Sequence, residues 1–282
     1  MKQLFTLILI VFVLTGCSNR LGYRFADTLV EWKLDDYVDL SGNLERDVSA
    51  SIDELHRWHA QTQLPAYRDL LLKIRTDLTR EDLTEQDLLL ISTAIYGLWE
   101  NIQLQVEPYA QVYLPRLSAA QRDQLVKTIQ KDLNEDIEEI KEQGSYEDSR
   151  EKRYKRMQDS FSEWLGTVTE AQLQYINQWL DQRDDMRMDW VSYRQRWLNN
   201  FAGAISEPSA ADYPQRIYAL IVQPEQLRSP ELQARIEANR AASIKLVHQV
   251  YQSMTAEQRR HLLDTIDGYL EDLDSLIETF SI

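Results

Sequence analysis

Glycine, proline and cysteine are scarce in this sequence. Its 282 residues include 8 Gly and 7 Pro, less than half of the ~12% that these two residues contribute to an average protein. Because β-sandwiches and barrels need many tight turns, this scarcity argues against them, and against collagen-like or low-complexity chains. A single Cys excludes a disulfide within the chain and a zinc site built on cysteines.

Positive charge is also in short supply. The chain has 31 Lys and Arg against 46 Asp and Glu, a formal net charge of −15. A surface this acidic repels phosphates, so we expect no nucleic-acid partner. The hydrophobic fraction of 43% is enough to build a core, which excludes wholesale disorder.

Catalytic motifs are absent. The sequence contains no Gly-x-Ser-x-Gly elbow, no phosphate-binding glycine loop and no dinucleotide fingerprint. The most suggestive acidic cluster is Asp35-Asp36 beside Trp32 and Tyr37, but the simpler interpretation is an acidic helix end on the surface. We therefore expect no enzymatic activity and no cofactor.

Four histidines give one candidate metal site. Asp53, His56 and His59 follow one another at intervals of three, so a helix would place them on one face, where two imidazoles and a carboxylate can bind zinc. The simpler interpretation is a solvated helix face. The other two histidines, His248 and His261, belong to other predicted helices, and we expect no metal.

The N-terminus has the parts of a secretory signal peptide. Lys2 supplies a positive charge, and the eleven residues from Leu4 to Leu14 are apolar except for Thr6. This apolar stretch is too short to span a bilayer, which takes about 20 residues.

The end of that segment is more specific. Leu14-Thr15-Gly16-Cys17 resembles the lipobox of bacterial lipoproteins. The resemblance implies cleavage after residue 16, a thioether-linked lipid on Cys17 and acylation of its new amino group. Ser18, in place of Asp, implies sorting to the outer membrane, facing the periplasm. The alternative is an ordinary signal peptide with a chance cysteine.

Processing would leave a mature chain of residues 17–282. Without Lys2 its formal charge becomes 30 − 46 = −16. The acyl chains on Cys17 would make the membrane its first partner, because each buried methylene contributes about 0.8 kcal/mol and several chains together anchor firmly.

The mature chain shows helical periodicity throughout and no sustained strand alternation. We predict an all-α fold, an antiparallel array of about eight to ten amphipathic helices. Helices are expected at 23–38, 44–62, 65–77, 84–113, 118–143, 146–165, 169–182, 188–204, 229–253 and 255–280. Three of the seven prolines fall within 206–224, which is therefore a possible hinge between two lobes.

Two oppositely charged runs lie next to each other in the sequence. Residues 131–142 are rich in Asp and Glu, whereas residues 150–156 are rich in Lys and Arg. If their helices fold back on each other, these runs would form an ion-pair network between the helices. The alternative is a basic patch for an anionic lipid or a partner.

A helix-start pattern recurs three times, as Ser118-x-x-Gln121, Thr169-x-x-Gln172 and Thr255-x-x-Gln258, each after an apolar residue. Each is a capping box, in which the hydroxyl and the carboxamide cap free backbone groups. The pattern also resembles the Leu-Thr-x-x-Gln motif of Spy-like periplasmic chaperones, which implies binding of unfolded clients without ATP.

A broader resemblance covers the mature chain. It rests on the lipobox and on the segments Gly22 to Asp27, Glu31 to Tyr37, Arg150 to Arg153, Glu163 to Gly166 and Thr169 to Gln172. This combination is similar to a family of Gram-negative lipoproteins with a domain of unknown function. It implies lipidation and an all-helical fold, and it carries no activity.

The expected function is therefore a membrane-anchored, non-enzymatic envelope protein that is chaperone-like or protein-binding, with a protein partner or unfolded client in the periplasm. The alternative is a structural or adaptor lipoprotein that docks onto an envelope complex. Trp179, Trp190 and Trp197 either line a binding groove or belong to the core.

Overall fold

The structure, a computed structural model, describes residues 22–281 of the chain. The fold of these residues is entirely helical. This confirms the predicted all-α class. None of the helices in this range is both long and apolar enough to cross a membrane. Cys17 and the signal segment lie outside the described residues.

The helices follow the predicted ranges closely. The first half of the chain forms α3 (Ala26–Asp35), α4 (Gly42–Trp58), a π-helical turn η1 (His59–Gln63), α5 (Leu64–Leu78), α6 (Glu85–Tyr113) and a short 3-10 turn η2 (Leu114–Arg116). The second half forms α7 (Ala119–Glu142), α8 (Arg150–Leu165), α9 (Glu170–Asp181), α10 (Arg187–Ser206), α11 (Tyr213–Val222), η3 (Pro224–Leu227), α12 (Pro230–Gln252) and α13 (Ala256–Phe280).

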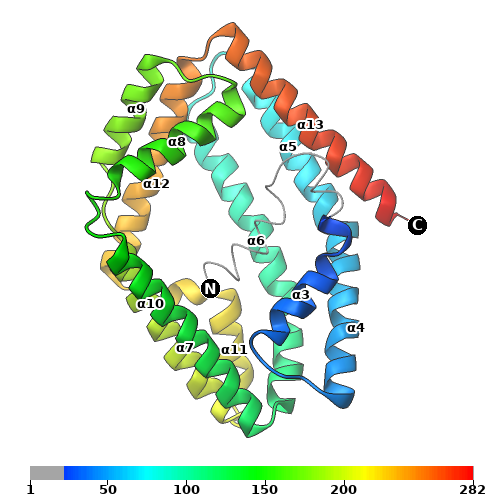
Figure 1. Ribbon diagram of the computed structural model, residues 1–282. Coiled ribbons are helices and arrows are strands. Elements are labelled where there is room, and N and C mark those ends of the chain that lie inside the picture. Colours follow the sequence, from blue (N-terminus) through cyan, green and yellow to red (C-terminus); the bar gives the residue numbers. More distant parts are fainter. Residues whose placement is uncertain (1–21, 282) are drawn as a thin grey trace.

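Helix α6 crosses the middle of the molecule, and the other helices lie around it (Figure 1). It packs against α4 and α5 on one side and against α11 and α12 on the other. The remaining helices pack in four groups. Helix α3 packs on α4, α13 lies along α5 and α8, α10 pairs with α7 and α11, and α9 packs on α8 and α12.

Buried apolar side chains form three separate clusters. One cluster joins α7, α10 and α11 around Ile217. A second joins α8, α9 and α12 around Ile176. The third is small and links Tyr23 and Leu64 to Leu276 of α13. The core is thus divided among pairs and triplets of helices.

Local signals explain where the helices begin and end. Capping boxes open α6, α7, α9 and α13, including all three Ser/Thr-x-x-Gln sites. Gly144 and Gly166, predicted as helix stops, follow α7 and α8 with φ of 71° and 76°, which favours glycine because it lacks a Cβ.

The segment 206–224 contains a helix that the periodicity did not reveal. Helix α11 begins with Tyr213 and Pro214 and places Ile217 and Leu220 in the first cluster. Pro214 fits there because the first turn of a helix has no use for its missing N–H. Hinge motion in this segment stays a prediction.

The predicted ion-pair network between the two charged runs is wrong. No ion pair in residues 22–281 joins them. Instead Asp136 of α7 pairs with Arg194 of α10, and Arg150 pairs with Asp181 of α9 at 2.6 Å. The reason is that α7 packs on α10 whereas α8 packs on α9 and α13, so the two helices do not fold back along each other.

Candidate functional site

The first described residues are held by a buried hydrogen-bond chain of three aromatic rings. The Tyr23 hydroxyl lies 2.8 Å from Nδ1 of His59, and the Tyr67 hydroxyl lies 3.1 Å from Nε2 of the same imidazole. A neutral imidazole has one N–H donor and one acceptor nitrogen, so it donates to one hydroxyl and accepts from the other. We call this arrangement the Tyr23 clasp.

Burial changes the acid–base properties of the clasp. It lowers the pKa of His59 to about 4, and the neighbouring His56 adds to this effect. Burial also raises the pKa values of Tyr23 and Tyr67 well above the usual value for tyrosine. All three groups are therefore neutral at neutral pH, because burial disfavours the charged form of each.

A π-helical turn positions the imidazole. His59 begins η1, between α4 and α5. The wider turn of a π-helix shifts the register of the following side chains, and such turns are frequent at functional sites. Around it, Tyr23 and His56 each contact the ring of Phe280, with centroids 5.5 Å and 5.2 Å apart.

This packing gives the three residues of the candidate metal site, Asp53, His56 and His59, different surroundings. His56 Nδ1 lies 3.5 Å from a carboxylate oxygen of Asp27, His59 belongs to the clasp, and Asp53 is exposed. Within residues 22–281, no group of three or more His, Cys, Asp or Glu side chains is placed to hold a metal ion.

Two of the recurring capping boxes meet in space. Gln172 and Gln258 are 0% and 1% exposed, and their carboxamides bond each other reciprocally, at 3.0 Å and 2.8 Å. Each Oε1 also caps its own helix by accepting the backbone N–H of Thr169 or Thr255. The motifs therefore join the starts of α9 and α13 besides capping them.

The third motif acts differently. Gln121 closes its capping box with Ser118 and donates from Nε2 to the carbonyl oxygen of Asp39, at 2.7 Å. This contact is exposed and ties α7 to the loop before α4. The sequence pattern is the same in all three places, and only the fold distinguishes their partners.

The tryptophans that could have lined a groove lie mainly in the core. Trp179 is buried in the second cluster and donates to Ser243 at 3.1 Å. Trp197 is buried in the first cluster, stacks on Phe201 and donates to the carbonyl oxygen of Leu220 at 2.9 Å. Trp190 is partly exposed.

The acidic pair Asp35-Asp36 does not form a buried acid–base site. Both residues are exposed, and Asp36 pairs with Lys33 at 3.0 Å. Tyr37 is buried beside them, but its hydroxyl donates to Asp132 of α7. This arrangement links the end of α3 to α7.

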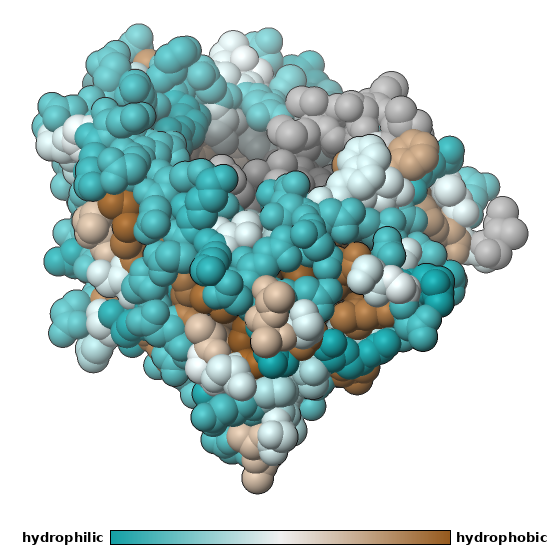
Figure 2. All heavy atoms as spheres, turned by 60° about the horizontal axis from the view of Figure 1, so that its bottom comes forward, coloured by the Kyte–Doolittle hydropathy of each residue, from teal (hydrophilic) through white to brown (hydrophobic). Residues whose placement is uncertain are grey.

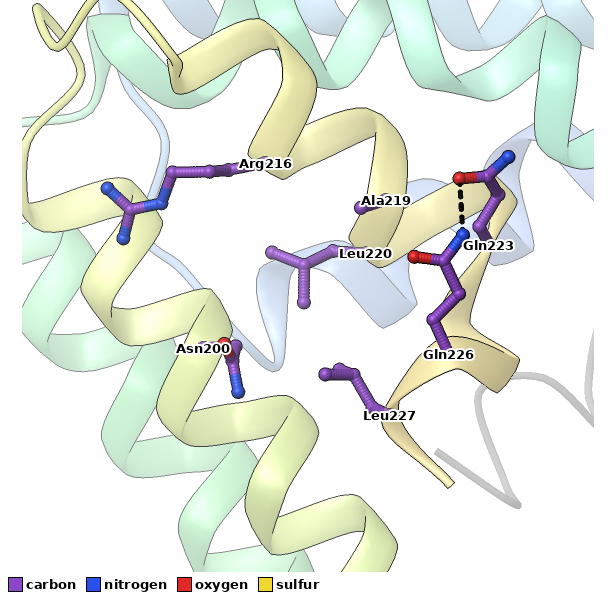
Figure 3. Close-up of a pocket in the computed structure, with 7 residues that line it drawn as sticks. All are labelled: Asn200, Arg216, Ala219, Leu220, Gln223, Gln226 and Leu227. Atoms are coloured by element: carbon purple, nitrogen blue, oxygen red, sulfur yellow. Dashed lines mark hydrogen bonds between the residues drawn. The ribbon is translucent and has the colours of Figure 1, made fainter. Parts of the chain in front are cut away.

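A small cavity of about 130 Å³ opens between α10, α11 and η3 (Figure 3). Its lining residues are Asn200, Arg216, Ala219, Leu220, Gln223, Gln226 and Leu227. Gln226 donates to Gln223 at 2.8 Å across its rim. The lining contains no carboxylate, imidazole or thiol, and ligand sites usually occupy ~300–1,000 Å³, so the cavity is a poor candidate for catalysis.

Apolar side chains also reach the surface. In the face shown in Figure 2, hydrophobic residues form several groups among hydrophilic ones. Several apolar residues of α6 are exposed to solvent. Among them are Leu90, Leu104 and Val112, with exposed fractions of 58%, 44% and 56%. These three residues lie nearly whole turns apart, so they share one side of the helix.

The helix at 84–113 is predicted from a stripe of apolar residues at intervals of three and four, which includes Ile91, Ile95 and Ile102 and lies on another side of α6. Ile102 of that predicted stripe is buried, whereas Ile95 is 50% exposed. In the whole helix only Ile102, Gln103 and Glu107 are buried. Leu90, Leu104 and Val112 were missed because a helix with apolar residues on several sides gives a weak periodic signal.

Comparison with known proteins gives one result. No curated protein and no solved structure matches the chain. A sequence profile described as Family of unknown function (DUF6279) matches residues 36–233, which is most of the chain and includes α4 to α11 completely. The chain therefore belongs to the Family of unknown function (DUF6279).

Proposed function

We propose that this protein is a lipoprotein of the bacterial outer membrane, anchored through Cys17, whose helical body binds unfolded or partly folded proteins in the periplasm. The anchor rests on the signal segment and the lipobox-like Leu14 to Cys17. The binding activity rests on the exposed apolar side of α6, which we call the α6 surface (Leu90, Leu104 and Val112).

The α6 surface suits an apolar polypeptide segment. Its side chains remain in water although α6 lies in the middle of the helical array. Covering apolar surface contributes about 25 cal/mol per Å², so an unfolded segment that lies along α6 gains free energy without a shaped pocket. Such binding needs neither a cofactor nor a nucleotide.

Suppression of aggregation tests the binding activity. The lipidated protein in detergent should suppress aggregation of a chemically denatured client at near-stoichiometric ratios without ATP. The triple variant Leu90→Asp, Leu104→Asp and Val112→Asp should lose most of this effect. Met188→Asp on α10, at a residue 54% exposed, is the matched control and should keep it.

Unchanged aggregation in the presence of the wild-type protein would refute the chaperone-like activity. The adaptor alternative has its own signature. Crosslinking in the native envelope would then capture one partner at constant stoichiometry, and the protein would leave client aggregation unchanged.

Metabolic labelling tests the anchor separately. Replacing Cys17 by Ala should abolish labelling of the protein by a clickable fatty acid, because this residue is the only cysteine. Labelling that persists in the variant would contradict the proposed lipid attachment.

A further inference from the structure

The first half of helix α3 places two carboxylates against the body and apolar side chains on the outside. Asp27 and Glu31, one turn apart, face α4, where Asp27 lies 3.5 Å from His56 and Glu31 accepts a hydrogen bond from Ser49. On the opposite side, Phe25 and Trp32 are 55% and 65% exposed. A surface helix of a globular protein normally has the reverse arrangement.

The exposed side has the composition of a membrane-interface helix. Phe25, Leu29 and Trp32 follow at intervals of four and three residues and form one stripe, which we call the outer face of α3. Trp and Phe are favoured at the boundary between headgroups and acyl chains, where an apolar ring can be covered. Val30, 41% exposed, extends the apolar area beside it.

The outer face of α3 follows Cys17 closely in the sequence, and this short separation indicates which partner covers it. Only four residues lie between Cys17 and Gly22, and the five Cα-to-Cα steps of a fully extended chain over this distance span at most about 18 Å. Helix α6, with 29 residues, is by comparison more than about 40 Å long. An anchor at Cys17 therefore brings the start of α3, and not the far side of the molecule, to the bilayer.

The start of α3 is fixed to the body and cannot swing away freely. Tyr23 is buried in the clasp and in the third cluster, and Arg24 donates to Thr279 at the end of α13, 3.3 Å away. Figure 1 shows α3 beside α4 and close to the end of α13. The clasp therefore fixes the orientation of the whole helical body relative to the point where the anchor would hold the chain.

We propose that the outer face of α3 lies in the interface of the bilayer that holds the acyl chains of Cys17. This inference rests on the proposed lipid anchor. The contact is apolar at Phe25, Leu29 and Trp32, because Asp27 and Glu31 face α4. The exposed Asp35 and Asp36 lie at the other end of the helix, where Asp36 pairs with Lys33. The α3 side of the body thus lies against the membrane, and the rest of the helical array projects into the periplasm.

Fluorescence quenching by lipid-bound nitroxides tests this orientation. Because lipidation occupies Cys17, an introduced cysteine is the only free thiol. Phe25→Cys and Trp32→Cys place an environment-sensitive dye on the outer face of α3. Tyr96→Cys on α6 and Met188→Cys on α10, at residues 60% and 54% exposed, are matched controls. Substitutions at exposed sites usually leave stability nearly unchanged.

The labelled, lipidated proteins are reconstituted into vesicles of phosphatidylethanolamine with a minor share of phosphatidylglycerol, with or without doxyl groups on the acyl chains. Dyes at positions 25 and 32 should be quenched several-fold more strongly than dyes at positions 96 and 188, and their emission should shift to the blue. Flotation of the same vesicles reports the anchor independently.

Three results would overturn the inference. Equal quenching at all four positions in floating vesicles shows an anchored body without a preferred orientation. A blue shift at positions 25 and 32 without quenching by doxyl lipids shows that a second copy or another protein covers α3. Protein that does not float with the vesicles removes the anchor, and with it both the proposed attachment and this orientation.

Discussion

At the residue scale, one imidazole joins three segments of the chain. His59 of η1 bonds Tyr23, which precedes α3, and Tyr67 of α5, and the ring of Phe280 of α13 packs against the ring of Tyr23. No local pattern distinguishes His59 from His56, three residues earlier. Their roles differ because one ring is enclosed by two hydroxyls and the other pairs with Asp27.

The lowered pKa of His59 predicts a loss of stability in acid. Its usual value of 6.5 falls to about 4 in the folded chain, so between these values the unfolded chain binds a proton that the folded chain does not. The free energy of unfolding should therefore fall as pH drops below 6.5 and level off below about 4, by about 3 kcal/mol in total from this group.

Urea denaturation between pH 7 and pH 4 measures this effect in the wild type and in His59→Gln. The variant should be less stable at pH 7 and should depend less on pH, because it lacks the titrating group. Parallel pH profiles for the two proteins would show that His59 does not cause the dependence.

The Gln172–Gln258 pair gives a second prediction at this scale. Gln172→Ala removes the carboxamide that caps Thr169. It also leaves one N–H of the buried Gln258 carboxamide without its acceptor, while the bond to the Thr167 carbonyl oxygen remains. Leaving a buried polar group unpaired costs about 1–3 kcal/mol, and loss of the cap adds to this. Gln121→Ala, at the exposed cap, should cost less, about 1 kcal/mol. Thermal unfolding of the two variants compares these costs, and equal costs would contradict a role beyond capping.

At the element scale, helix ends follow from a few residues each. The capping boxes and the glycines at 144 and 166 are local signals, so the predicted boundaries agree with the structure to within a few residues for most helices. Helix α11 was missed because its ten residues follow a proline-rich stretch and are too few for a clear periodic signal. It is stabilised by burial of Ile217 and Leu220 in the first cluster.

Two glycines provide opposite predictions for the same substitution. Gly166 has φ of 76°, and a Cβ there would lie 3.3 Å from the ring of His261. Gly166→Ala should therefore destabilise the protein by about 1 kcal/mol or more. Gly268 lies inside α13 with nothing within 4 Å of an added Cβ, so Gly268→Ala should stabilise it by about 0.5–1 kcal/mol. Differential scanning calorimetry measures both, and shifts of the same sign would contradict this account.

At the scale of the whole molecule, the division of the core into three clusters has an energetic consequence. Ile217 and Ile176 are both 0% exposed and belong to different clusters. Each Ile→Ala change should cost about 2–5 kcal/mol. Because the two residues share no cluster, the double variant should lose the sum of the single losses within about 0.5 kcal/mol. Denaturant titration of the three variants checks this, and strong non-additivity would show that the clusters behave as one core.

The same division accounts for the exposed apolar side of α6. Only Ala110 of this helix packs against one of the three clusters, and Ile102 is its one buried aliphatic residue. The exposed Leu90, Leu104 and Val112 are the basis of the proposed binding activity.

The sequence by itself determined the all-α class, most helix limits and the candidate anchor at Cys17, because periodicity, capping and a lipobox-like motif are all encoded by residues near one another in the chain. The tertiary structure decided which capping glutamines pair, which histidine lies between two tyrosines and which side of α3 faces outward. These features depend on contacts between residues up to 255 positions apart, as between Arg24 and Thr279, and no local pattern encodes such contacts.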